Sequence, residues 1–90
     1  MKMITQLINK AGNAVKNQFV ITEGNTKTFQ SYSSKIAKVE SDGTVYLDAV
    51  YWDYSATTLK HLKTFLDVDL SKKQIQANLD NSVYKLTALN

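Results

Sequence analysis

His61 is the only histidine of this 90-residue chain, and histidine is the side chain best suited to acid–base chemistry near neutral pH. Catalysis would also require a carboxylate that orients the imidazole and a nucleophile within hydrogen-bonding reach. Asp48, Asp53 and Asp67 could lie near His61 in space, but no spacing along the chain shows it. In the helix expected around it, His61 falls at the border of the apolar face, one turn before Phe65. We therefore predict a half-buried boundary position for His61 and no enzymatic activity.

Other site chemistries are limited by the residue types that the chain lacks. It has no Cys, no Pro and no Arg, so all eleven basic residues are Lys, and the net charge is +3. A disulfide framework, a zinc site with Cys ligands and arginine clamps for phosphate are thereby excluded. The three glycines form no phosphate loop, and no apolar run reaches the roughly 18 residues of a membrane span. We expect no cofactor, no metal and no membrane partner.

Large aromatic side chains are concentrated in one short segment, at Tyr46, Tyr51, Trp52 and Tyr54. We expect Trp52 to lie in the core, where a strand leads into a helix. One or two of the tyrosines should remain at the surface, because alternate residues of a strand point in opposite directions. Exposed tyrosines anchor protein interfaces and also stack nucleobases.

Lysines provide a second surface feature. Lys60 and Lys63 lie off the apolar stripe of one predicted helix, and Lys72 and Lys73 open the next. If the two helices pack side by side, these four ammonium groups share one face, although a solvated helix face is the ordinary explanation of such charges. Positive charge is slightly unfavourable at a helix N-terminus, which hints that Lys72 and Lys73 serve a partner. The predicted contact surface comprises Tyr54, Lys60, His61, Lys63, Lys72 and Lys73.

The elements that must position these residues begin with a predicted helix over residues 3–16. Its apolar stripe has helical spacing, although Gly12 weakens the pattern. The stripe consists of Ile4, Leu7, Ile8, Ala11 and Val15. Strand patterns rich in β-branched and aromatic residues follow. They span residues 18–23, 26–32, 35–40 and 44–51, and the polarity of the 26–32 segment suggests an edge position or one solvated face.

Turn and cap signals divide the rest of the chain. Asp42-Gly43 supplies the positive-φ positions of a tight hairpin turn. A helix is expected over 56–67, capped by Asp53 or Ser55, and a second begins at Ser71 with a capping box to Gln74. A last strand spans 82–89. The predicted fold is α+β in one domain, residues 1–90, with an antiparallel sheet (a four-strand meander plus the C-terminal strand), an N-terminal helix, and two further helices mainly on one face.

Two segments carry a family resemblance, SYSSKIA at residues 31–37 and YWDYSATTLKHLKTFL at residues 51–66. With the SKK segment and the final strand, they resemble a pattern SY-x-S-x-IA followed by WDYS-x-TT-x-KH in small proteins of phages, prophages and plasmids of Gram-positive bacteria, lactic acid bacteria especially. The resemblance covers about residues 28–89. It implies an accessory protein of a mobile element, placed in the cytoplasm of a bacterial host, and it assigns no catalytic residue.

Two functions follow as expectations. The first is a non-enzymatic protein that binds a host or phage macromolecule, as an inhibitor of a host defence system in the manner of anti-CRISPR proteins. The alternative is sequence-independent binding of DNA or RNA, in which Lys neutralises phosphate and exposed Tyr stacks bases. The third alternative is a minor enzyme that depends on His61. A homodimer through the polar strand at 26–32 would follow if that strand lies at the sheet edge.

Overall fold

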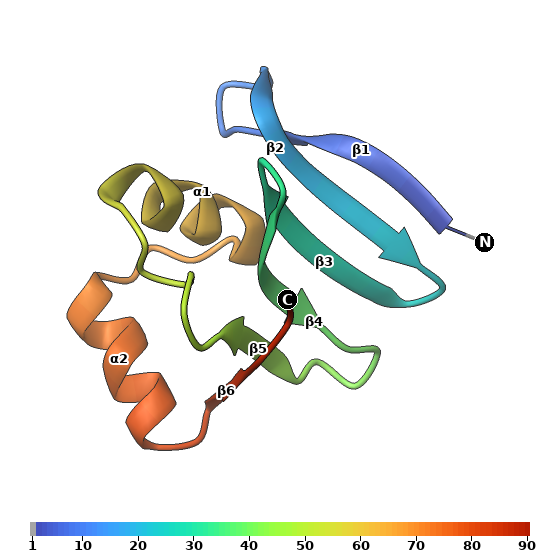
Figure 1. Cartoon of the computed structure of the whole chain (residues 1–90). Coiled ribbons are helices and arrows are strands. Elements are labelled where there is room, and N and C mark those ends of the chain that lie inside the picture. The colour runs from blue at the N-terminus through green and yellow to red at the C-terminus, as the bar shows by residue number, and fades with distance from the viewer. Residues whose placement is uncertain (1) are drawn as a thin grey trace.

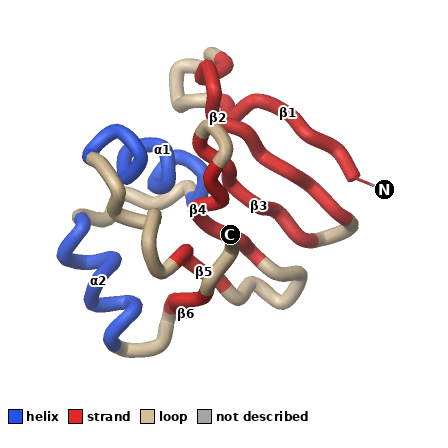
Figure 2. Tube along the Cα trace, in the orientation of Figure 1, coloured by secondary structure: helices blue, strands red, loops and turns tan. Residues whose placement is uncertain are grey.

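The computed structural model describes residues 2–90 and has an α+β fold, in which one six-stranded sheet packs against two helices (Figure 1, Figure 2). Neighbouring strands of the sheet follow the order of the chain, from β1 at one edge to β6 at the other. The elements are β1 (Lys2–Ile8), β2 (Ala14–Glu23), β3 (Thr26–Ser31), β4 (Ser34–Val39), β5 (Val45–Asp48), α1 (Ala56–Leu66), α2 (Lys72–Asp80) and β6 (Tyr84–Thr87).

The predicted fold class is confirmed, whereas the prediction of a wholly antiparallel sheet is wrong. Strands β1 to β5 form an antiparallel meander joined by short turns. Strand β6 instead pairs with β5 in parallel. Because both helices lie between β5 and β6 in the chain, this connection is long enough to return the chain to the same end of the sheet, as a parallel pairing requires.

The prediction of a helix over residues 3–16 is also wrong, because this segment forms β1, a turn, and the start of β2. The side chain of Asn9 accepts hydrogen bonds from the backbone N–H groups of Ala11 and Asn13, each at 3.0 Å. Gly12 takes a φ of +84°, which glycine adopts without steric cost. This turn chemistry interrupts a spacing of apolar residues that otherwise fits a helix.

The core lies between the sheet and the helices. Phe29, Ile36, Leu47, Leu62 and Ile75 are its largest fully buried side chains. Helix α1 packs against β3, where the ring of Phe65 stacks on that of Phe29 with 5.6 Å between centroids. Helix α2 packs against β6 and contributes Ile75. Trp52 is buried in the same cluster, as predicted.

Both helices begin at predicted caps. The Ser55 side chain caps α1, and Ser71 and Gln74 form the complete capping box of α2. The Asp42-Gly43 turn is confirmed as well, with Gly43 at a φ of +88° and the Asp42 carboxylate accepting from the backbone N–H of Thr44. Local signals of this kind involve contacts within four residues, so the sequence displays them directly.

One end of the sheet is a ribbon formed by β1 and β2, whose end at the β2–β3 turn lies away from both helices (Figure 1). Leu7 is the one buried residue of β1. Of the two explanations for the polar 26–32 segment, the edge position is wrong, because this strand, β3, is paired on both sides, with β2 and with β4. The premise of a dimer through that strand is therefore not met, because the sheet edges are β1 and β6.

Candidate functional site

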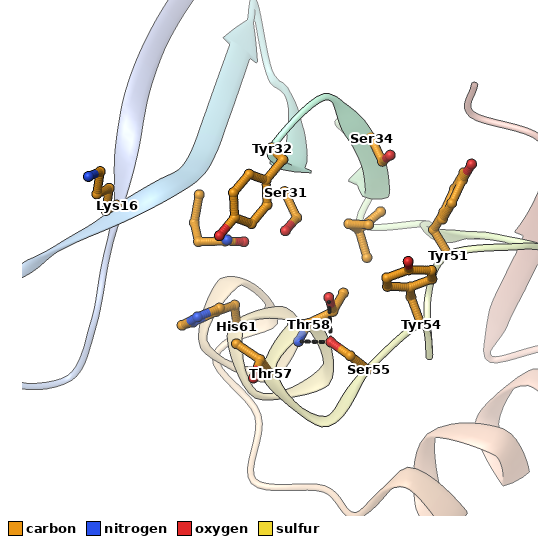
Figure 3. Close-up of a pocket in the computed structure, with 12 residues that line it drawn as sticks. Lys16, Ser31, Tyr32, Ser34, Tyr51, Tyr54, Ser55, Thr57, Thr58 and His61 are labelled. Carbon is orange, nitrogen blue, oxygen red and sulfur yellow. Dashed lines mark hydrogen bonds between the residues drawn. The ribbon is translucent and has the colours of Figure 1, made fainter.

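A cleft of about 650 Å³ opens where strands β2, β3 and β4 face the beginning of α1 (Figure 3). We call it the tyrosine cleft, because Tyr32, Tyr51 and Tyr54 all line it. From the strand side it is lined by Lys16, Gln18, Ser31, Tyr32, Ser34 and Ile36. From the loop after β5 and from α1 it is lined by Tyr51, Tyr54, Ser55, Thr57, Thr58 and His61.

Irregular pairing of β2 shapes the strand side of the cleft. Gln6 of β1 pairs with Phe19, but Leu7 pairs with Val15, so three residues of β2 bulge out between these pairs. Asn17, at the centre of the bulge, has a φ of +64°. Bulges redirect side chains and are frequent beside functional sites. Here the bulge contains Lys16 and Gln18, both of which line the cleft.

Tyr32 lies in the turn between β3 and β4 with a φ of +54°, a conformation that bulky residues rarely adopt. Its N–H donates to the carbonyl oxygen of Asn17 at 2.7 Å, and Gln30 Nε2 donates to the Tyr32 carbonyl oxygen at 2.8 Å. Tyr32 is 66% exposed, so burial of its side chain does not offset the energetic cost of this backbone conformation. Strain of this kind costs roughly 1–3 kcal/mol and clusters at functional sites.

On the helix side, the hydroxyl groups of Ser55 and Thr58 are engaged in the hydrogen bonds that cap α1. Ser55 Oγ accepts from the backbone N–H of Thr58 and donates to Thr58 Oγ1, both at 3.0 Å (Figure 3). Tyr51 and Tyr54 lie next to this cap, with ring centroids 5.9 Å apart and planes tilted by 58°. Tyr54 is 72% exposed. One rim of the cleft therefore offers an aromatic pair, and the opposite rim offers Tyr32.

The loop that carries Tyr51 is held by the buried carboxylate of Asp48. Asp48 Oδ2 accepts from the N–H groups of Val50 (3.1 Å) and Tyr51 (3.0 Å), while Oδ1 accepts from the N–H of Leu89 (2.8 Å). Burial raises the pKa of Asp48, but the hydrogen bonds from Leu89, Tyr51 and Val50, with the Asn90 side chain, outweigh it and leave the pKa below its ordinary value. The charged form of Asp48 therefore stabilises the rim of the cleft.

Gln18 is the most unusual residue of the cleft. Its side chain lines the cavity but is only 3% exposed, and its Oε1 atom has no hydrogen-bond partner among residues 2–90. A buried polar group without a partner costs roughly 1–3 kcal/mol. Native structures contain few such groups, and each requires an explanation such as a ligand.

The electrostatics of the cleft are positive. Among the described residues, Lys16 is the one lysine that lines the cavity, and no Asp or Glu lines it. Burial, followed by the nearby charge of Lys60, lowers the pKa of His61 below its ordinary value, which favours the neutral imidazole. The cleft thus suits a ligand that carries negative charge and flat apolar groups. It holds donors and acceptors for binding, and no hydrogen bond joins its hydroxyls to His61 as a nucleophile–base pair would require.

The structure divides the surface predicted from the sequence. Tyr54 and His61 line the tyrosine cleft. Lys60 and Lys63 line a shallower hollow of about 360 Å³ together with Lys10, which we call the lysine hollow. It lies between α1 and the β1–β2 turn and also contains Asp69.

Lys72 and Lys73 lie apart from the cleft and from the lysine hollow. Lys72 forms an exposed ion pair with Asp53 at 3.5 Å, and Lys73 is exposed at the start of α2. Because α1 packs against β3 and α2 against β6, the side-by-side helices that would unite the four lysines are not observed (Figure 1).

Sequence reasoning missed Lys16, Gln18 and Tyr32 as site residues. Lys16 was hidden by the assignment of a helix that ended at this residue. Gln18 was placed in the strand predicted over residues 18–23, but burial of a glutamine has no local signal. Tyr32 could have been found, because it belongs to the SYSSKIA segment and lies between two strand patterns.

Comparison with known proteins identifies a family and assigns no activity. The chain belongs to a family of unknown function (DUF8033), whose model matches residues 2–81. Neither the curated proteins nor the solved structures give a match. Among residues 2–90, no group of three or more His, Asp or Glu could hold a metal ion. Within the same residues, no helix is long and apolar enough to cross a membrane.

Proposed function

We propose that the protein binds single-stranded nucleic acid without enzymatic activity and that the strand crosses the tyrosine cleft. The observation that carries this proposal is the pair of exposed rings, Tyr32 and Tyr54, on opposite sides of a cleft that no carboxylate lines. Stacking of one base on an exposed aromatic ring contributes roughly 1–3 kcal/mol and tolerates any base.

Lysines supply the electrostatic part of the proposed binding. Lys16 lies in the cleft, and Lys10, Lys60 and Lys63 lie in the lysine hollow. Helix α1 contributes to both cavities, through His61 to the cleft and through Lys60 and Lys63 to the hollow. A strand that leaves the cleft over α1 meets these ammonium groups. Lysine contacts phosphate as a point charge without reading bases, so this part of the binding is independent of sequence.

The test is fluorescence anisotropy with a labelled single-stranded oligonucleotide of 12 nucleotides and mixed sequence, in DNA and RNA form. Four phosphate contacts predict a slope of log K against log salt of about −3, since each contact on a single strand contributes about −0.7. Lys16→Glu should weaken binding about tenfold or more. Lys27→Glu, at an exposed position near the other end of β3 and outside the cleft lining, is the charge-matched control and should change it less than twofold. Absence of binding at about 50 mM salt would contradict the proposal.

A second candidate function, binding of a protein partner, is supported by β1. This strand lies at the sheet edge, and its Met3, Ile4 and Ile8 are each more than half exposed. Open edges accept an added strand from a partner chain. The role as an inhibitor of host defence, which the resemblance to mobile-element proteins implies, belongs to this candidate and stays a prediction.

The protein-partner candidate is tested by affinity purification from the natural host with quantitative mass spectrometry. A specific partner should be retained by the wild type and by Lys16→Glu but lost by Ile4→Lys, which places a charge on the exposed strand. Equal recovery with wild type and Ile4→Lys would remove β1 as the contact. The same purification with Lys60, Lys63, Lys72 and Lys73 all changed to Glu tests the surface predicted from the sequence.

A further inference from the structure

We infer that the tyrosine cleft holds one nucleobase edge-on, with an N–H group of the base donating to Oε1 of Gln18. This inference deepens the proposed function and rests on it, since it concerns the same cleft. Stacking and lysine charges alone would bind a strand without distinguishing its bases. The inference adds a buried subsite that contacts a single base.

The first argument is the unpaired amide itself. Gln18 is nearly fully buried, lines the cavity, and leaves Oε1 without a partner among the described residues. Carbonyl oxygens of amides accept hydrogen bonds, so the missing partner is a donor. Fully ionised phosphate and carboxylate groups offer acceptors only and would leave Oε1 unpaired. The edges of nucleobases carry the required N–H groups.

The second argument is the placement of a neighbouring hydroxyl. Gln18 of β2 is directly paired with Ser31 of β3, and both side chains are buried and line the cleft. The amide and the hydroxyl thus stand side by side and offer acceptors and donors together. A base edge alternates donors and acceptors in the same way, and amides form paired hydrogen bonds with such edges.

The third argument is the shape and polarity of the walls. The cavity of about 650 Å³ lies within the roughly 300–1,000 Å³ range of sites for small organic ligands. Tyr32, Tyr51 and Tyr54 supply aromatic walls around the polar floor (Figure 3). Lys16 supplies a positive charge for the phosphate attached to the base, and no lining carboxylate repels it.

The backbone beside the subsite adopts strained conformations, which are frequent at binding sites. Two residues beside the subsite, Asn17 and Tyr32, have positive φ, and a hydrogen bond of 2.7 Å joins them. This link fixes the β2 bulge, which carries Gln18, to the turn that carries Tyr32.

The experiment is an NMR titration of the full chain with adenosine 5′-monophosphate, adenosine and ribose 5-phosphate, together with anisotropy of the single-stranded 12-mer. Adenosine and its monophosphate should bind and should shift the side-chain NH₂ signals of Gln18. Ribose 5-phosphate, which lacks a base, should bind at least about tenfold more weakly. Cytidine 5′-monophosphate, which also presents an amino group, tests whether the subsite accepts a pyrimidine.

The decisive variant is Gln18→Met, which keeps the side-chain length and removes the acceptor. It should weaken adenosine 5′-monophosphate about tenfold or more, and weaken the 12-mer as well, because a base contact is lost. Its Tm should equal or exceed that of the wild type, because a buried polar group without a partner has been removed. Gln6→Met makes the same change on exposed β1 and should alter neither binding nor Tm.

The outcomes separate this inference from the proposed function. Suppose that the 12-mer binds, that adenosine and both monophosphates do not bind, and that Gln18→Met leaves the affinity for the 12-mer unchanged. The amide is then only hydrated and the base subsite is overturned, but nucleic-acid binding stands. If the nucleotides bind through Gln18 and the 12-mer does not bind, the subsite stands and the proposed function fails. If nothing binds, both fail. If Gln18→Met does not fold, unmoved Gln18 NH₂ signals in the titrated wild type overturn the inference alone.

Discussion

The β1–β2 ribbon and the part of the sheet that contacts the helices use similar residue types in opposite ways. In the ribbon, Met3, Ile4 and Ile8 remain more than half exposed. In the core between the sheet and the helices, Leu47 of β5, Leu62 of α1 and Ile75 of α2 are fully buried. Apolar side chains thus stabilise one region by burial and leave the other with surface for a partner. The tyrosine cleft lies where the two regions meet, since β2 belongs to both.

One substitution in each region tests most directly whether burial stabilises the two regions differently. Ile75→Ala removes a fully buried side chain of α2 and should lower the free energy of unfolding by roughly 2–5 kcal/mol. Ile4→Ala, at a position 58% exposed in β1, should change it by about 0.5 kcal/mol or less. Urea unfolding followed by circular dichroism measures both values. Similar losses for the two variants would show that the ribbon is packed against something in solution.

Asp48→Asn should have the next largest effect, because the carboxylate joins the loop after β5 to the C-terminal segment. One amide oxygen cannot replace two carboxylate oxygens that accept three backbone N–H groups, and the loss is roughly 2–4 kcal/mol. Binding of the 12-mer should weaken too, because Tyr51 lies on this loop.

The pH dependence of Asp48 gives the same prediction an independent check. The pKa of Asp48 is lowered in the folded protein, so its stabilising contribution is present above the unfolded pKa of about 3.9. This contribution is lost as the pH falls through the lower folded pKa. Wild-type stability should therefore decline across this acid range, and the decline should be smaller in Asp48→Asn. Parallel pH profiles for the two proteins would contradict the role given to the carboxylate.

Tyr32→Gly should weaken binding of the 12-mer without lowering the stability of the fold. Glycine accepts a positive φ without steric cost, so stability should stay the same or rise by up to about 1 kcal/mol. Loss of a stacking ring should weaken the 12-mer by roughly 1–3 kcal/mol. Thermal unfolding and anisotropy test the pair of outcomes. A destabilised variant with unchanged affinity would mean that Tyr32 serves the fold alone.

The sequence was a better guide to the helices than to the ribbon. Both caps and the Asp42-Gly43 turn rest on contacts between near neighbours in the chain, and all three are confirmed. The N-terminal residues 3–16 have apolar spacing that fits a helix, and the turn at Asn9 and Gly12 together with the pairing of β1 and β2 decides in favour of strands. The parallel β5–β6 pairing is likewise a property of the whole fold.

The candidate site was predictable only in part for the same reason. Tyr54 and His61 belong to a segment whose local pattern marks the entry to α1, and the structure brings both to the cleft. Gln18 becomes a site residue because a bulge in β2 and pairing with β3 bury its amide beside Ser31. No spacing along the chain encodes that outcome.

The measurement that tests the central claim most directly is a chemical-shift map of the wild-type protein titrated with the single-stranded 12-mer. Binding in the tyrosine cleft predicts the largest backbone shifts at Ser31, Tyr32, Tyr54 and Thr57, with little change along β1. Shifts confined to β1, or none at about 50 mM salt, would contradict the assignment of the cleft as the nucleic-acid site.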